Sequence, residues 1–215
     1  MKKRVLAIVF SILLLVICLA SCGKGTDVPK GMKEAQDKTN AFYTMYVPEN
    51  WVVIETNSNV TLAQARDKIL GSSDLKAVTV NAMFWGIENE LLGEEKKPEA
   101  YKTFYEKYQE DMKATFKEFY NLTNLEEDNA SPYREDARVY SFVACYGNIY
   151  YKYNMTVIIH NQMYYVITFN FPQNNVTLGQ DGNLVKTEKW EDAKFDDDKY
   201  SAEIEDVVSN FKPEK

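Results

Sequence analysis

Three apolar runs separated by short polar breaks constrain the fold of this chain more than any other feature. They cover residues 138–146, 150–159 and 163–171, and they are rich in the β-branched and aromatic residues that favour strands. Breaks of only a few residues join neighbouring strands as hairpins. The three runs therefore predict an antiparallel three-stranded meander.

The alternation of the second and third runs predicts their register. If the turn is His160-Asn161-Gln162, then Ile159 faces Met163, and four more apolar pairs follow on the same face. Those pairs are Val157/Tyr165, Met155/Ile167, Tyr153/Phe169 and Tyr151/Phe171. A two-residue turn would mix the two faces. We therefore predict a three-residue turn, with Asn161 or Gln162 near the left-handed region.

Shorter strand patterns precede the meander. The strand-like segments are Phe42–Val47, Trp51–Thr56 and Ala77–Trp85, with a turn at 48–50 between the first two. In the third segment, Val78, Val80, Ala82 and Phe84 alternate onto one face. Thr61–Leu70 fits a short helix instead, because Leu62, Ala65 and Ile69 recur at helical spacing.

Two helices are predicted, each from an apolar stripe with a period of about 3.6 residues. The first begins at Pro98, which suits a first helical turn, and we interpret its stripe as a core face. That stripe contains Tyr101, Phe104, Tyr105, Tyr108, Met112, Phe116 and Phe119. The second helix begins at Asp196-Asp197-Asp198, where an aspartate can cap free N–H groups. Its stripe contains Tyr200, Ile204, Val207, Val208 and Phe211.

The first 21 residues have the pattern of a secretory signal peptide. Three cations at positions 2–4 precede an apolar run over 5–20. Sixteen residues are short for a helix that crosses a membrane core about 30 Å thick. We therefore predict a leader that is removed, not a permanent span.

The leader ends in Leu19-Ala20-Ser21-Cys22, which resembles the lipobox of bacterial lipoproteins. That resemblance implies cleavage between Ser21 and Cys22 and acylation of the Cys22 thiol, with palmitate or a similar chain. Acyl chains then hold the protein at the membrane, at about 0.8 kcal/mol per buried methylene. Residues 22–40, rich in glycine and lysine, are predicted to be a flexible tether. The alternative is an ordinary signal peptide that leaves Cys22 as a bare thiol.

Charge and cysteine content narrow the possible partners. Loss of the leader removes three cations and moves the formal net charge from −7 to −10, which argues against a nucleic-acid partner. With Cys18 in the leader and Cys22 acylated, Cys145 is left alone, so an internal disulfide is excluded. Because Cys145 lies in an apolar run, we expect a small buried residue rather than a reactive thiol.

Three strings carry a resemblance to a known family: Tyr46–Trp51 (YVPENW), Tyr164–Phe169 (YYVITF) and Ile204–Lys212 (IEDVVSNFK). Together with the order of predicted elements, they resemble the PsbP/Mog1-like family over about residues 41–212. That family includes the extrinsic photosystem II protein, a Ran-binding protein and many bacterial lipoproteins. The resemblance implies an α+β fold, with an antiparallel sheet flanked by helices on both faces as an α/β/α sandwich. It also implies a single domain over 41–215. No motif of this chain carries a photosystem or Ran contact across.

Motifs of catalysis are missing from the sequence. His160 is the only histidine, and neither a glycine-rich phosphate loop nor a Gly-x-Ser-x-Gly elbow occurs. Asp196, Asp197 and Asp198 are the best candidates for metal ligands, because calcium takes about six to eight oxygens. Their spacing departs from the EF-hand pattern, and helix capping explains the triplet. We therefore expect no metal, no cofactor and no catalytic residue.

Taken together, these features favour a noncatalytic binding or accessory module, anchored at the extracytoplasmic face of a cell membrane. Trp190 and Phe195 in the polar stretch 172–196, and Trp85, are the aromatic residues expected at a surface for a protein or small-molecule partner. Two alternatives stay open: an envelope enzyme or maturation factor, and a small-solute or calcium-binding lipoprotein. An enzyme needs a pocket with converging titratable groups. A solute receptor needs an apolar cavity between the helix at 98–120 and the sheet.

Overall fold

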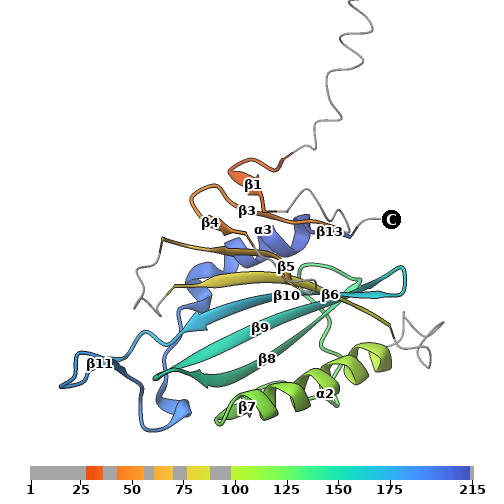
Figure 1. Ribbon diagram of the computed structural model, residues 1–215. Helices are drawn as coiled ribbons and strands as arrows, with labels where there is room; N and C mark the ends of the chain where they lie inside the picture. Colours follow the sequence, from red (N-terminus) through yellow and green to blue (C-terminus); the bar gives the residue numbers. More distant parts are fainter. Residues whose placement is uncertain (1–27, 36–42, 56–60, 70–76, 88–97, 214–215) are drawn as a thin grey trace, which may run out of the picture. The chain divides into compact units, whose positions relative to one another are not determined.

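The computed structural model (Figure 1) describes five stretches of the chain: residues 28–35, 43–55, 61–69, 77–87 and 98–213. The chain divides into two compact units, Met1–Lys30 and Gly31–Lys215, and every helix and strand below belongs to the second unit. The predicted signal peptide, with Ser21 and the acylation site Cys22, lies outside the described residues.

A seven-stranded antiparallel sheet forms the body of the fold, in the order β4-β5-β6-β10-β9-β8-β7. Its strands are β4 (Val52–Ile54), β5 (Thr61–Arg66), β6 (Thr79–Gly86), β7 (Phe119–Asn121), β8 (Ala137–Tyr146), β9 (Ile149–His160) and β10 (Met163–Pro172). The long strands β8, β9 and β10 are neighbours, which confirms the predicted meander (Figure 1). The mainly antiparallel sheet, with α-helices as separate elements, agrees with the α+β prediction.

Within the described stretches, three two-stranded sheets accompany the main sheet. They are β1 (Met32–Glu34) with β3 (Tyr46–Pro48), β2 (Tyr43–Thr44) with β13 (Lys212–Pro213), and β11 (Thr177–Leu178) with β12 (Leu184–Val185). Of the flexible tether predicted for residues 22–40, the structure describes residues 28–35, and the first pair corrects the prediction for Met32–Glu34. Met32 is buried and its strand is hydrogen-bonded to β3, so these three residues are part of the fold.

Two α-helices lie among the described residues. The helix α2 (Pro98–Thr115) begins at the predicted proline but ends before Phe119, which was expected to continue its stripe. Phe119 belongs to β7 instead, opposite Ala144 of β8. The helix α3 (Ser201–Asn210) follows a 3-10 turn, η3 (Asp197–Tyr200). In the described part of the chain, no helix is both long enough and apolar enough to span a membrane.

The strand β5 corrects the helix predicted for Thr61–Leu70. Ala63 and Ala65 are buried, whereas Gln64 and Arg66 between and beyond them are half-buried. This two-residue period is that of a strand, and β5 pairs with β4 on one side and β6 on the other. Pairing on both edges decides the conformation of a segment whose apolar residues also fitted a helical spacing.

The turn between β9 and β10 has two residues, not the predicted three. His160 lies opposite Met163, and Asn161 and Gln162 form the whole turn. Their φ angles of 49° and 61° confirm the left-handed backbone expected at one of these positions.

The predicted cross-strand pairs are therefore wrong by one residue. Ile159 lies opposite Tyr164 rather than Met163. The observed pairs further along include Ile158/Tyr165, Val157/Val166 and Thr156/Ile167. Both faces of these strands are buried over this stretch, so apolar residues occur at odd and even positions alike. Under those conditions alternation does not select a register.

The buried apolar residues form two clusters. The α3 cluster includes Ile204, Val207, Val208 and Phe211 together with Ala65, Val80, Ala82, Tyr165, Ile167 and Phe169. The predicted common face of Val78, Val80 and Ala82 is confirmed, since all three belong to this cluster. The α2 cluster consists of Tyr101, Tyr105, Tyr140, Phe142, Ala144, Met155, Val157, Tyr164 and Val166. Successive residues of β10 thus belong to different clusters.

Candidate functional site

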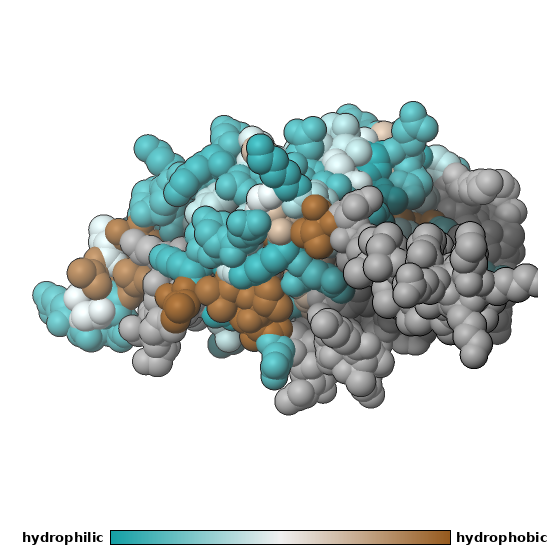
Figure 2. Space-filling view, turned by 90° about the horizontal axis from the view of Figure 1, so that it is seen from above, coloured by the Kyte–Doolittle hydropathy of each residue, from teal (hydrophilic) through white to brown (hydrophobic). Residues whose placement is uncertain are grey.

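Among the described residues, exposed apolar side chains do not mark an extensive interface. On the face shown in Figure 2 most described residues are hydrophilic, and hydrophobic residues gather in limited patches. The most exposed large apolar residues of the described part, Ile69, Leu178 and Tyr146, come from separate elements. Hollows in the surface, where side chains from several elements converge, are therefore the candidate sites.

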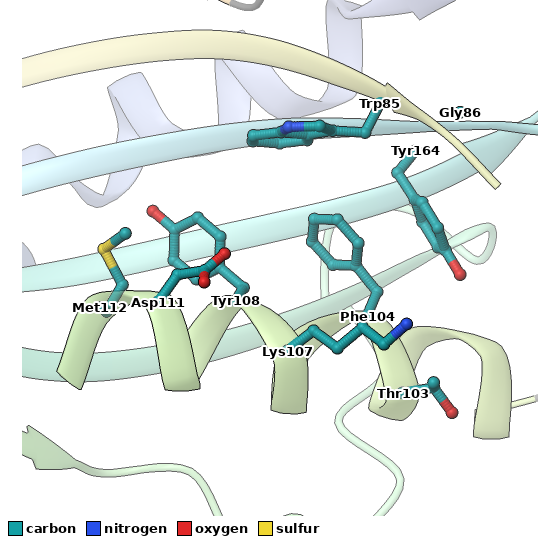
Figure 3. Close-up of a pocket in the computed structure, with 9 residues that line it drawn as sticks. All are labelled: Trp85, Gly86, Thr103, Phe104, Lys107, Tyr108, Asp111, Met112 and Tyr164. Carbon is teal, nitrogen blue, oxygen red and sulfur yellow. The ribbon is translucent and has the colours of Figure 1, made fainter. Parts of the chain in front are cut away.

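An aromatic groove lies between α2 and the end of β6 (Figure 3). We define it by Trp85, Phe104, Tyr108, Met112 and Tyr164, which line a hollow of about 300 Å³. Ligand pockets in proteins span about 300–1,000 Å³ and are mostly apolar, with a few polar groups. This groove has the size and composition of a site for a small ligand.

Helix periodicity builds one wall of the aromatic groove. Phe104, Tyr108 and Met112 are four residues apart on α2, so they form a single row. All three are half-buried, whereas the neighbouring row of Tyr101, Tyr105 and Gln109 is buried. The inner row therefore packs on the sheet, and the outer row is left beside the hollow.

The opposite wall comes from the sheet. Trp85 of β6 lies next to Tyr164 of β10 in the antiparallel register. Its indole ring is 5.5 Å from the Phe104 ring and 6.3 Å from the Tyr108 ring, measured between centroids. The Phe104 and Tyr164 rings are 4.3 Å apart. These edge and tilted contacts fix the ring orientations.

Polar groups occur at the mouth of the aromatic groove. Thr103, Lys107 and Asp111 form the next row along α2, and Figure 3 shows the last two beside the rings. Inside the groove, burial raises the pKa of Tyr108 to about 12, so its phenol is neutral at physiological pH. The Tyr164 hydroxyl donates to the carbonyl of Ala100 at 3.2 Å. The groove can therefore bind a molecule and orient it, but the Tyr108 phenol is not poised as a base.

The three aromatic residues expected at a partner surface lie in different places. Trp85 lines the aromatic groove. Trp190, in the short 3-10 helix η2 (Trp190–Asp192), stacks on Tyr120 of the edge strand β7, with the ring centroids 5.1 Å apart. Phe195 packs, partly buried, against the α3 cluster. Since β10, β9 and β8 lie between β6 and β7, these residues do not form one surface.

The three aspartates at 196–198 interact with different partners. The Asp196 carboxylate accepts from the Asn174 amide at 2.6 Å, Asp197 forms an ion pair with Lys152, and the Asp198 carbonyl accepts from the Ser201 hydroxyl. The capping prediction is wrong, because neither η3 nor α3 has a side-chain hydrogen bond at its N-cap. In the part of the chain that the structure describes, no group of three or more histidine, cysteine or acidic residues could hold a metal ion.

The most closely connected titratable residues are Glu118, Tyr150 and Lys186. The Tyr150 hydroxyl donates to the Glu118 carboxylate at 2.5 Å, and the Lys186 ammonium donates to both partners. The bond from Tyr150 lowers the pKa of Glu118, while burial and Glu118 raise the pKa of Tyr150 to about 12. Burial alone would lower the pKa of Lys186, but its bonds to the other two raise it. Each shift stabilises the ordinary protonation state, so this trio is built for structure.

Cys145 is half-buried, not fully buried as expected, because it lies near the end of β8 beside an open hollow. Burial and the neighbouring Glu118 raise the pKa of its thiol. A higher pKa reduces the thiolate fraction, which is the nucleophilic form.

The outer row of α2, which consists of Phe104, Tyr108 and Met112, is the part of the aromatic groove that the sequence did not predict. Its residues were assigned to the core because they belong to an aromatic stripe with helical period. The stripe was, however, wider than one buried face requires, since it held two parallel rows. A second row of large rings beside a complete inner row is the signal that pointed to a groove.

Comparison with known proteins finds similar chains among solved structures. No family model and no curated protein matches the chain. Among solved structures it is similar to the solution structure of cyanobacterial PsbP (CyanoP) from Synechocystis sp. PCC 6803, with 12% sequence identity and a TM-score of 0.47. The match covers 90% of this chain and 98% of that chain. The neighbour is a PsbP protein, and the sequence strings resemble the PsbP/Mog1-like family. A likeness at this level carries no argument about function.

Proposed function

We propose that this chain is a noncatalytic binding module that takes the apolar body of a small molecule in the aromatic groove. The observation that carries this proposal is the half-buried row of Phe104, Tyr108 and Met112, set opposite the Trp85 indole around a hollow of about 300 Å³. Burial of rings and alkyl groups there is favourable by about 25 cal/mol per Å² of apolar surface removed from water.

The dimensions of the groove favour a small solute over a protein. A hollow of about 300 Å³ is at the lower end of ligand pockets and holds one or two rings. Lys107 and Asp111 at its mouth offer both signs of charge, so a polar end of the ligand can point to solvent. The partner is therefore a compact molecule with an aromatic or branched apolar body.

The titratable groups support a binding role rather than catalysis. In the trio of Glu118, Tyr150 and Lys186, the pKa of each side chain is shifted further from neutral pH. Catalytic acids and bases need pKa values near the working pH. The Cys145 thiol is likewise less acidic than a free thiol.

We further infer a lipoprotein held at the extracytoplasmic face of a cell membrane through Cys22. The charged and apolar leader and the Leu19–Cys22 string support this inference. Membership of the PsbP/Mog1-like family is part of the same proposal. So is an α/β/α sandwich, because successive β10 residues belong to the α2 and α3 clusters and neighbouring side chains of a strand point to opposite faces.

Equilibrium dialysis with indole tests the aromatic groove. The full-length protein is held in lipid nanodiscs, with empty nanodiscs as the background. Trp85→Ala should weaken indole binding at least tenfold, because it removes one wall. The matched control is Trp190→Ala, which removes an indole that is also half-buried and in contact with an aromatic ring, but outside the groove. Equal loss in both variants, or unchanged binding by Trp85→Ala, would reject the site.

Mass spectrometry of the protein from membranes tests the anchor. The expected N-terminus is a diacylglyceryl-modified Cys22. Cys22→Ser should leave the leader uncleaved and the thioether absent. An unmodified thiol at Cys22 in processed protein would reject the anchor while leaving the groove proposal intact.

A further inference from the structure

A second hollow of about 660 Å³ lies beyond the C-terminal end of α2. We call it the polar groove and define it by Gln64, Arg66, Thr79, Phe116, Tyr153 and Asn170, which come from β5, β6, α2's C-terminal flank, β9 and β10. It differs from the aromatic groove in that its residues from β5, β6 and β10 are polar. Only Phe116 and Tyr153 of this set are aromatic.

The register of the sheet places four of these residues in one row. Arg66 lies opposite Thr79, Thr79 opposite Asn170, and Asn170 opposite Tyr153. Directly paired residues of antiparallel strands point to the same face, and neighbouring strands are about 4.8 Å apart. The row therefore runs from a cation, through a hydroxyl and an amide, to an aromatic ring.

Arg66 has no partner among the described residues. Its Nε atom is buried without a hydrogen bond, and none of the ion pairs between described residues includes Arg66. The other arginines of the described part are paired, Arg134 with Asp136 and Arg138 with Asp128. A buried donor without an acceptor is costly, and such groups in native proteins call for an explanation.

Asn170 is unsatisfied in a complementary way. Its side-chain carbonyl oxygen is buried and accepts no hydrogen bond within the described part of the chain. Arg66 thus lacks an acceptor, while Asn170, two strands away in the same row, lacks a donor. One molecule that carries an anion and a nearby hydrogen-bond donor would satisfy both.

The rest of the groove fits such a molecule. The Phe116 and Tyr153 rings have their centroids 6.0 Å apart, and Tyr151 lies 6.4 Å from Tyr153. These rings offer an apolar surface at the end of the row that is remote from Arg66. Besides Arg66, the charged residues that line the groove are Lys117 and Glu118, and the Glu118 carboxylate is already bonded to Tyr150 and Lys186.

We propose that the polar groove binds a small organic anion with an aromatic or apolar body. Its carboxylate pairs with the Arg66 guanidinium, whose planar fork matches a carboxylate with two parallel hydrogen bonds. A hydroxyl next to the carboxylate donates to the Asn170 oxygen. The ring of the ligand packs against Phe116 and Tyr153. This site is separate from the aromatic groove and does not depend on it.

Three probes test these contacts on the full-length protein in nanodiscs. Mandelate carries a carboxylate, a neighbouring hydroxyl and a phenyl ring. Phenylacetate lacks the hydroxyl, and mandelamide lacks the charge. Equilibrium dialysis should show mandelate binding at least tenfold more tightly than mandelamide and several-fold more tightly than phenylacetate. If mandelamide binds as tightly as mandelate, or if mandelate does not bind, the proposal is overturned.

Substitutions then assign the contact to Arg66. Arg66→Gln should reduce mandelate binding at least tenfold, and Arg66→Lys should retain part of it. The matched control is Lys117→Gln, which removes a cation at the same groove and should change binding less than twofold. If Arg66→Gln does not fold, the probe series is repeated on the Trp85→Ala variant, in which the aromatic groove lacks one wall. A preference for mandelate over mandelamide that persists there belongs to the polar groove, because the two probes differ mainly in charge. Trp85→Ala should leave mandelate binding unchanged, which separates this site from the aromatic groove. Equal effects of Arg66→Gln and Lys117→Gln would contradict a specific contact.

Discussion

The α3 cluster and the α2 cluster differ in how completely their side chains are enclosed. Among the described residues, the α3 cluster combines 22 buried residues with five partly buried ones, whereas the α2 cluster combines nine with ten. Small residues such as Ala63, Ala65 and Ala82 let neighbouring elements approach closely in the first. The second is built largely from rings, which contact one another but leave hollows.

This difference separates two tasks within one sheet. A closed cluster removes the most apolar surface from water, so it contributes most to folding. A half-open cluster keeps apolar surface available to another molecule. Both proposed grooves lie beside the half-open cluster, because Phe104, Tyr108, Met112 and Phe116 of its partly buried margin line them.

Truncating a phenylalanine in each cluster should give the largest contrast. Phe169 in the α3 cluster is 1% exposed, and Phe104 at the margin of the α2 cluster is half-buried. Phe169→Ala is expected to lower the free energy of unfolding by about 3–5 kcal/mol, since it leaves a cavity in a closed core. Phe104→Ala should cost about 1–2 kcal/mol, because its ring already contacts water. Urea denaturation measures both, and equal losses would contradict the comparison.

Removing a buried tyrosine hydroxyl should have opposite effects in the two clusters. Tyr105 in the α2 cluster donates to Asn121 at 2.8 Å, so Tyr105→Phe is expected to cost about 1 kcal/mol. Tyr46 in the α3 cluster has a buried hydroxyl with no partner within the described part of the chain. Tyr46→Phe should therefore be neutral or stabilising. Thermal unfolding of the two variants gives the sign, and a loss in Tyr46→Phe equal to that in Tyr105→Phe would overturn this prediction.

The helices and the meander could be predicted from sequence because their signals are local. Pro98 and the 3.6-residue stripe located α2, and the apolar runs located β8, β9 and β10. The register between β9 and β10 could not be predicted in the same way. Alternation selects a register only where one face of the strands is exposed to solvent. Here both faces are buried over much of β9 and β10.

The grooves depend on relations that a linear pattern does not contain. The sequence predicts Trp85 at a partner surface, but its opposition to Phe104 requires knowing how α2 packs on β6. The row from Arg66 to Tyr153 joins two pairs of strands, β5/β6 and β9/β10, and the two pairs are far apart in sequence. Because the apolar spacing over 61–70 predicts a helix rather than β5, the sequence indicates neither the face of Arg66 nor its missing partner.

A change in the β9–β10 turn should stabilise both clusters together. This turn sets the register that assigns alternate β10 residues to the two clusters. Gln162 has a φ of 61°, which glycine adopts without strain, and Asn-Gly is the preferred pair for such a turn. Gln162→Gly is expected to raise the free energy of unfolding by about 0.5–1 kcal/mol. The control is Gln162→Ala, which keeps a Cβ atom and should bring no gain, and chemical denaturation compares the two.

Acid titration should give the smallest effect, and it is confined to the open end of the α2 cluster. The hydrogen bond from Tyr150 lowers the folded-state pKa of Glu118 below its ordinary value of 4.5. A lowered carboxyl pKa contributes stability that is complete above the unfolded value and is lost as the pH falls through the folded value. Because the Glu118 side chain is 35% exposed, solvent screening limits this contribution to about 0.2–1 kcal/mol.

Glu118→Gln separates that charge from the shape of the side chain. The glutamine can still accept from Tyr150, so the variant loses mainly the ionised oxygen. At about pH 7 it should be less stable than the parent by the amount above, and the gap should close as the pH falls below about 4.5. Urea midpoints measured from about pH 7 to about pH 3 follow the gap. A difference in stability that persists in acid would mean that Glu118 acts through packing. The end of the α2 cluster at Glu118 would then be closed like the α3 cluster, which would contradict the difference between the two clusters.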